Sequence, residues 1–141
     1  MKIVVISGSR SWDDEEAVAR ALYGAELLIV GDANGADRIA LLKALEWDII
    51  PAVYCADADT YGVYQRDKIP SFLSPVTWQQ DRRRAGPIRN AMMVRRAFEE
   101  RLAGMDVRCH AFPGPKSVGT YNCKAQLEAA GFVVNCYDKA A

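Results

Sequence analysis

Short apolar runs that end in glycine-bearing turns constrain the fold of this chain more than any other feature. Residues 3–6 (IVVI), 27–30 (LLIV) and 109–112 (CHAF) have the length and apolar character of buried parallel strands. A glycine-bearing turn follows each run, and a helical pattern follows each turn. Parallel strands that alternate with helices place their carboxyl ends at one edge of the sheet, where α/β proteins bind ligands. The sequence therefore predicts an α/β fold with a ligand site at that edge.

The alternation extends along most of the chain. It predicts five strands, at 2–7, 26–30, 49–54, 107–112 and 132–137, and four helices, at 14–23, 35–46, 87–102 and 119–130. This order is typical of a Rossmann-like three-layer α/β/α sandwich with a mostly parallel five-stranded sheet. Because the chain has 141 residues, we expect a single domain, 1–141.

Residues 55–85 interrupt the alternation, and we expect a long irregular stretch there. The stretch contains Tyr61, Tyr64 and Trp78, and this aromatic content argues against disorder. We interpret residues 56–84 as an insertion or a lid over the strand ends, with an oligomer contact as the alternative.

Composition restricts the classes of function. Lys and Arg number 18, and Asp and Glu also number 18, so the net charge of zero argues against non-specific nucleic-acid binding. The apolar runs are too short for a membrane span or for the core of a signal peptide. We therefore expect a cytoplasmic protein without a membrane partner.

The cysteines and the single histidine do not have the spacing of metal ligands. Cys55, Cys109, Cys123 and Cys136 are widely separated, and His110 is the one histidine. We expect no metal and no cofactor. Cys109 and Cys136 fall in predicted strands, where we expect them to pack in the core.

The first glycine-bearing turn supplies candidate ligand contacts. Gly8 permits close approach of the backbone, Ser9 can donate to a phosphate or ribose oxygen, and Arg10 can bind an anion through two N–H groups. The alternative is a tight turn with a solvated arginine.

The second turn has two glycines ahead of a predicted helix. Gly31 and Gly35 bound the loop, and we expect both to contact the ligand because glycine lets the backbone approach it closely. Asp37 lies in the first helical turn. Asp37 can accept a hydrogen bond from a sugar hydroxyl, or it can simply favour the helix dipole.

Pro87 suits the first position of a helix, which would place Arg89 and Asn90 at the helix start, near the ligand edge. A positive charge there opposes the helix dipole, and an anionic ligand would remove that conflict. We therefore predict that both residues bind the ligand.

The segment 113–120 has the features of a phosphate cradle. Gly114 and Gly119 allow close backbone approach, and Thr120 offers a hydroxyl at the helix start. A plain loop with a helix cap is the alternative.

Taken together, four segments resemble the SLOG superfamily of Rossmann-like proteins, in particular its YspA-type (cpYpsA-related) branch. They are GSRSWDD (8–14), VGDANGADRIA (30–40), TWQQDRRRAGPIRNAMM (77–93) and FPGPKSVGT (112–120). Distant relatives in the superfamily include DNA-processing proteins and the Lonely-guy phosphoribohydrolases, which release a free base from nucleoside monophosphates. The resemblance implies a nucleotide-like ligand, either a nucleoside phosphate or an ADP-ribose-like compound, and a homo-oligomer, specifically a dimer.

One departure from the Lonely-guy motif bears on catalysis. That motif reads P-G-G-x-G-T-x-x-E, and Cys123 occupies the position of its glutamate. A thiol cannot take over the role of a carboxylate at neutral pH unless its pKa is strongly shifted. We therefore predict a nucleotide-binding domain, and we keep two alternatives.

The first alternative is a nucleotide N-glycosidase that takes its acid or base from Asp32, Asp37 or Asp81, with Asp37 and Arg89 as the candidate catalytic residues. The second is the binding of single-stranded nucleic acid through residues 82–84 (RRR) and Trp78. The zero net charge makes nucleic acid the least favoured of these ligands.

Overall fold

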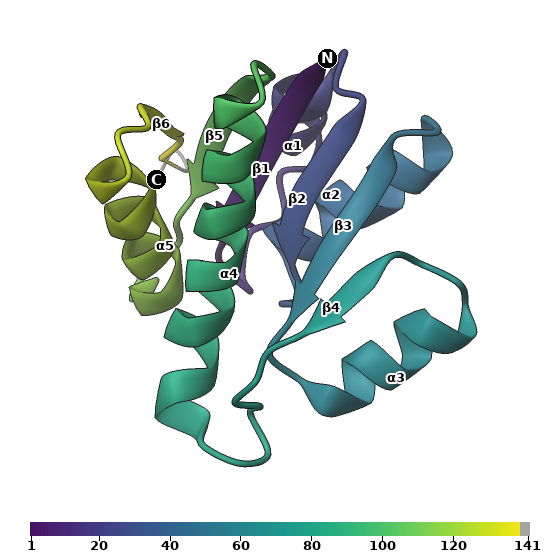
Figure 1. Cartoon of the computed structure of the whole chain (residues 1–141), viewed down its shortest axis with the longest axis vertical. Helices are drawn as coiled ribbons and strands as arrows, with labels where there is room; N and C mark the ends of the chain where they lie inside the picture. The colour runs from purple at the N-terminus through teal and green to yellow at the C-terminus, as the bar shows by residue number, and fades with distance from the viewer. Residues whose placement is uncertain (139–141) are drawn as a thin grey trace.

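The computed structural model describes residues 1–138, and it shows a six-stranded parallel sheet with helices on both faces (Figure 1). The elements are β1 (Lys2–Gly8), α1 (Glu15–Leu22), β2 (Leu27–Gly31), α2 (Ala36–Glu46), β3 (Ile50–Cys55), α3 (Ala58–Arg66), β4 (Ser71–Leu73), α4 (Arg82–Leu102), β5 (Asp106–Phe112), α5 (Val118–Ala129) and β6 (Val134–Cys136). The strand order is β4-β3-β2-β1-β5-β6. The predicted α/β/α sandwich is confirmed.

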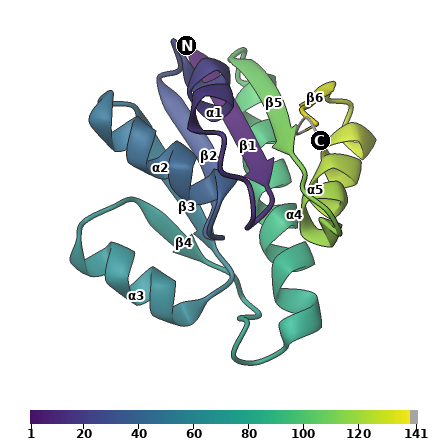
Figure 2. The ribbon, with the colours of Figure 1, turned by 180° about the vertical axis from the view of Figure 1, so that it is seen from behind.

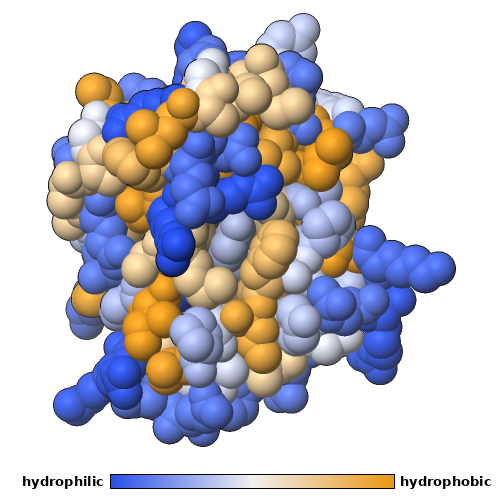
Figure 3. Space-filling model, viewed as in Figure 1, coloured by the Kyte–Doolittle hydropathy of each residue, from blue (hydrophilic) through white to orange (hydrophobic). Residues whose placement is uncertain are grey.

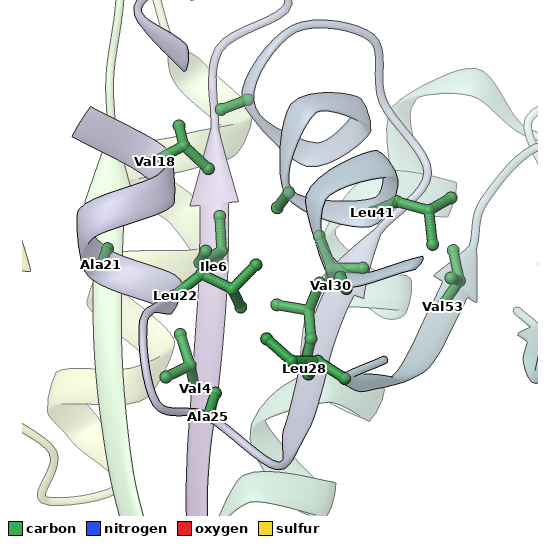
Figure 4. Close-up of a cluster of buried hydrophobic side chains, with 14 of the residues drawn as sticks. Val4, Ile6, Val18, Ala21, Leu22, Ala25, Leu28, Val30, Leu41 and Val53 are labelled. Carbon is green, nitrogen blue, oxygen red and sulfur yellow. The ribbon is translucent and has the colours of Figure 1, made fainter. Parts of the chain in front are cut away.

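The sheet is buried on both faces, which explains the continuous apolar runs in its strands. Helices α1 and α2 cover one face of the sheet (Figure 2), and Val4 and Ile6 of β1 belong to the buried cluster on that face (Figure 4). Ile3 and Val5 point to the opposite face, which α4 and α5 cover. Successive side chains of a strand alternate between the two faces of the sheet. Because helices cover both faces, all four residues are fully buried.

The segment that we expected to be irregular contains a helix and a strand, so the prediction of five strands was wrong. Asp57 caps α3 by accepting hydrogen bonds from the backbone N–H groups of Asp59 and Thr60. The three residues of β4 then pair in parallel with the end of β3 and extend the sheet. A strand of three residues is too short to give a readable periodicity, which is why the sequence pattern missed it.

Helix α4 begins five residues earlier than predicted. Asp81 accepts hydrogen bonds from the N–H groups of Arg83 and Arg84 and caps the helix, and Pro87 lies inside it. Arg89 and Asn90 therefore lie about two turns into α4. The prediction that both residues stand at the helix start was wrong, and the conflict with the helix dipole does not arise there.

The prediction for the cysteines in strands holds for one and fails for the other. Cys109 in β5 is buried. Cys136 is exposed, because β6 is a short edge strand that pairs with β5 on one side. On the face drawn in Figure 3, hydrophobic residues occur in several separate patches among hydrophilic ones. Within residues 1–138, the helices are too short or too polar to cross a lipid bilayer.

Candidate functional site

The three predicted glycine-bearing turns meet at the carboxyl edge of the sheet, in the lower half of Figures 1 and 2. The order of the strands reverses between β1 and β5, and such a reversal is the usual place for a ligand in α/β sheets. Ser9 donates its N–H to the carbonyl of Phe112 (2.9 Å), and Ala36 donates its N–H to the carbonyl of Ser9 (3.2 Å). The turn after β1 is therefore held between the other two.

At three of the predicted ligand-binding glycines, contact between neighbouring loops leaves no room for a Cβ. A Cβ on Gly8 would collide with the Cβ of Ala36. Gly35 has a φ of 76°, and its Cβ would collide with the carbonyl of Ser9. A Cβ on Gly114 would lie 2.6 Å from Ser9 Oγ. These glycines let the loops contact one another, and their contact with a ligand stays a prediction.

Four hydroxyl groups gather where β1 and β5 end, and we call Ser9, Ser11, Ser117 and Thr120 the hydroxyl cluster. Ser9 Oγ lies 2.9 Å from Ser11 Oγ, and Ser117 Oγ donates to Thr120 Oγ1 at 3.1 Å. The N–H of Gly114 donates to Ser117 Oγ at 3.1 Å. Gly119 is the second residue of α5, and a Cβ there would meet no atom within 4 Å. The predicted residues 114, 119 and 120 thus come together with Ser9 at the first turn of a helix.

A pocket of about 220 Å³ lies beside this cluster, beyond the ends of β2 and β3. We call it the arginine pocket. Its walls come from the turns after β1, β2 and β3, from α3, from the loop between β4 and α4, and from the first turns of α4: Arg10, Asp32, Ala33, Asn34, Ala56, Asp57, Thr60, Trp78, Gly86 and Arg89. Arg10 and Arg89 were predicted to bind the ligand, and the structure brings both into one pocket.

Arg89 is held in the pocket wall by acceptors far away in the sequence. Its Nη1 donates to Asp32 Oδ1 at 2.6 Å, and its Nε donates to Asn90 Oδ1 at 2.9 Å. The side chains of Arg89 and Asp32 are 13% and 5% exposed. Asp32 also accepts hydrogen bonds from the N–H groups of Ala56 (3.1 Å) and Asp57 (2.9 Å). Asp32 therefore fixes both Arg89 and the start of the α3 segment.

Asp37 lies beneath the arginine pocket and is buried. Its Oδ2 accepts a hydrogen bond from the N–H of Ala33 at 3.2 Å, while its Oδ1 has no partner among residues 1–138. Burial raises the pKa of this carboxyl from 3.8 to about 7, against the opposing effect of Arg89. A Cβ on Gly31 would lie 2.7 Å from both Asp37 Oδ2 and Arg89 Nη1, so glycine at 31 makes room for both groups.

Asn90 joins α4 to α5 and does not line the pocket. Its Nδ2 donates to the carbonyl of Gly119 and to Asn122 Oδ1, both at 3.2 Å. Because Asn90 also accepts from Arg89, it connects the pocket to the helix that carries the hydroxyl cluster. A direct contact of Asn90 with a ligand stays a prediction.

Trp78 forms the outer wall of the arginine pocket. The guanidinium carbons of Arg10 and Arg82 lie 5.1 and 5.0 Å from the centre of its indole ring. Both distances are within the range of cation–π interactions. The backbone N–H of Trp78 donates to the carbonyl of Ala56, which attaches this wall to the end of β3. An aromatic ring and two cations therefore stand together at the mouth of the pocket.

Two further titratable groups near the sheet, the thiol of Cys123 and the imidazole of His110, are neutral at pH 7. Cys123 is fully buried, and burial raises the pKa of its thiol to about 11. His110 lies with Nδ1 2.9 Å from the hydroxyl of Tyr137, and burial lowers its pKa to about 4. In the part of the chain that the structure describes, no three His, Cys, Asp or Glu side chains group as metal ligands do.

Sequence reasoning missed the part of the pocket that comes from β3 and α3. Asp57 and Thr60 line the pocket, and neither was a candidate. One signal was present: the apolar run before Asp57 predicted a third strand whose carboxyl end reaches the same edge. Trp78 was singled out for nucleic-acid stacking, and it proves to belong to this pocket.

Comparisons with known proteins support the fold and show a relative along the whole chain. The Gene 61 protein of Mycobacterium phage D29 is 34% identical over 149 residues, which cover 99% of each chain. Among solved structures, DNA processing protein A (DprA) of Streptococcus pneumoniae superposes with a TM-score of 0.52 at 17% identity. That match covers 95% of this chain and 58% of the DprA chain, so this chain spans little more than half of DprA. No protein-family model matches the sequence.

Proposed function

This chain belongs to the family of the phage Gene 61 protein, and we propose that it binds a nucleotide or a nucleotide-derived ligand at the carboxyl edge of its sheet. The observation that carries the proposal is the pairing of two cations, Arg10 and Arg89, with an indole ring in one pocket. Cations suit phosphate, and the ring of Trp78 suits a base.

The hydroxyl cluster supports an extended ligand. Ser9 and Arg10 are adjacent, yet Ser9 lies against Gly114 and Arg10 lines the arginine pocket. A ligand that contacts this turn can therefore reach both places. We propose that Arg10 and Arg89 bind the phosphate from the side of the pocket, that the hydroxyls and the first N–H groups of α5 also contact it, and that Trp78 stacks on the base. A nucleoside phosphate and an ADP-ribose-like compound both have this composition.

The fold adds to this proposal. The likeness to DprA supports the SLOG superfamily at the level of fold, and the four segments quoted above favour its YspA-type branch. We also propose, from that resemblance, that the protein forms a homodimer and that residues 56–84 cover the bound ligand. Analytical ultracentrifugation at several protein concentrations tests the dimer.

Calorimetric titration with AMP and with ADP-ribose tests the binding site. Arg10→Ala removes an exposed cation of the pocket whose loss leaves no buried group without a partner. We expect it to weaken binding by about 1.5–3 kcal/mol, the range for a hydrogen bond to a charged group. Arg95→Ala is the matched control, because Arg95 lies on the exposed face of α4 and pairs there with Glu99. Equal affinity of the Arg10 and Arg95 variants would contradict the proposed site.

A nucleotide N-glycosidase is the second candidate, and Asp37 is the observation that favours it. A carboxyl group whose pKa is near 7 is suited to general acid–base catalysis. Of the other candidate carboxylates, Asp32 binds Arg89 and Asp81 caps α4. Chromatography of AMP incubated with the protein would reveal free adenine. The glycosidase hypothesis expects base release that is lost in Asp37→Asn and kept in Asp81→Asn, and unchanged AMP would refute it.

Single-stranded nucleic acid is the third candidate. DprA is named as a DNA processing protein, and Arg82 lies on Trp78 in this chain. Binding of this type depends strongly on salt. An oligonucleotide titration at two salt concentrations therefore tests it, and absence of binding at low salt would refute it.

A further inference from the structure

Two buried carboxylates, Asp32 and Asp37, share one cation, Arg89, in the wall of the arginine pocket. Arg89 Nη1 is 2.6 Å from Asp32 Oδ1, and the same nitrogen and Asp37 Oδ2 lie on the same side of Gly31. If both carboxylates were ionised, the three groups would carry a net negative charge with little access to water. An uncompensated buried charge is costly, and a proton on one carboxyl removes it.

The hydrogen bonds indicate which carboxyl group takes the proton. Asp32 accepts hydrogen bonds from Arg89 and from two backbone N–H groups, so both of its oxygens already have donors. Asp37 accepts from Ala33, and the backbone N–H of Gly8 also lowers its pKa, but its Oδ1 is buried without a hydrogen bond of normal geometry in the described part of the chain. A proton added to Asp37 therefore disturbs fewer hydrogen bonds than a proton added to Asp32 would. Its pKa of about 7 is consistent with this choice.

The other groups around Asp37 do not supply a second cation. Cys123 of α5 and Tyr64 of α3 interact electrostatically with Asp37, and burial raises the pKa of each. Both are neutral at pH 7. Arg38, the next residue of α2, is exposed to solvent. The charge of Asp37 thus depends on Arg89, which Asp32 already engages.

We propose that Asp37 takes up a proton when an anionic ligand binds to Arg89. This inference rests on the proposed function, because it needs an anion in the arginine pocket. An anion beside the guanidinium adds negative charge close to Asp37. It also offsets the positive charge of Arg89, which stabilises the ionised form of Asp37. The neutral acid is then favoured, so ligand binding and proton binding strengthen each other.

The test is calorimetric titration of ADP-ribose at pH 8 in two buffers that differ in ionisation enthalpy. ADP-ribose is chosen because its diphosphate does not titrate near neutral pH. In the protein without ligand, Asp37 is about nine-tenths ionised at pH 8. We therefore expect an uptake of up to about 0.9 proton per ligand bound. The affinity should also fall as the pH rises from 7 to 9, by at most about tenfold per pH unit.

Two variants complete the experiment. Asp37→Asn has no proton to exchange, so its binding should release or take up none and should vary little with pH. Asp14→Asn alters the cap of α1, away from the pocket, and should keep the uptake of the wild type. Circular dichroism checks that both variants fold. If Asp37→Asn does not fold, the buffer dependence of the wild type alone decides.

The outcomes separate the two proposals. Binding of ADP-ribose without proton uptake would overturn the role of Asp37 and leave the nucleotide site standing. Equal uptake by wild type and Asp37→Asn would also overturn it. If neither ADP-ribose nor AMP binds the wild type, the proposed function fails, and the coupling fails with it.

Discussion

Replacement of Asp37 by Asn should change how the stability of the protein depends on pH. In the folded protein the pKa of Asp37 is raised from 3.8 to about 7 by burial. Between these two values the unfolded chain has lost the proton and the folded chain keeps it. Folding therefore takes up a proton, and the stability that Asp37 confers at low pH is lost as the pH rises to about 7.

The size of this effect follows from the two pKa values. A change from 3.8 to about 7 corresponds to a free energy on the order of 4 kcal/mol. In Asp37→Asn this term is absent. The free energy of unfolding of the variant minus that of the wild type should therefore increase by on the order of 4 kcal/mol between pH 4 and pH 8.

Urea unfolding followed by circular dichroism at pH 4, 6, 7 and 8 measures this difference. His110, whose lowered pKa of about 4 also makes stability depend on pH, is present in both proteins, so its effect cancels. A difference that stays constant within about 1 kcal/mol across this range would refute the reasoning, because it would mean that Asp37 has a similar pKa in the folded and unfolded chains.

Three substitutions and one chemical modification test the packing, the helix cap and the burial that the structure shows. Gly31→Ala should destabilise the protein by about 1–3 kcal/mol because its Cβ would meet Arg89 and Asp37 at 2.7 Å, whereas Gly62→Ala, in open space within α3, should stabilise by about 0.4–1 kcal/mol; thermal unfolding compares the two. Asp81→Ala should lower the unfolding free energy by about 1 kcal/mol through loss of the α4 cap, and an unchanged value in urea unfolding would contradict that cap. A thiol reagent should modify Cys136 rapidly in the native protein and all four cysteines after denaturation, and two or more fast thiols would contradict the burial of the others.

The central part of the fold was predictable because its signals are local. The runs 3–6 and 27–30 are apolar without interruption, as strands buried on both faces must be, and glycine marks the end of each. The start of α4 was not predicted correctly, because Pro87 satisfied a rule for the first helical position. Asp81, which lies six residues before Pro87 and caps the helix in the structure, was not recognised as the capping residue. β4 could not be found, since its three residues are defined by pairing with β3.

The sequence predicted several residues of the site, but not the contacts that bring them together. Arg89 was predicted to bind a ligand because its charge would oppose the helix dipole, and that conflict does not exist. It lies in the pocket because it is hydrogen-bonded to Asp32, 57 residues away in the sequence. Gly8 and Gly35 were chosen for ligand approach, and the structure gives them contacts with neighbouring loops. Such contacts between distant segments leave no pattern in the sequence. They require the folded chain.

One measurement tests the central claim most directly: incubation of the purified protein with nucleoside mono- and diphosphates, ADP-ribose and NAD, read by thermal shift and by chromatography of the same samples. We predict that at least one of these ligands raises the melting temperature of the wild type, and that the shift is smaller in Arg10→Ala than in Arg95→Ala. Recovery of the ligand intact would favour binding, and release of a free base would favour the glycosidase. A melting temperature unchanged by every ligand, with every ligand recovered intact, would contradict a nucleotide site at this edge of the sheet.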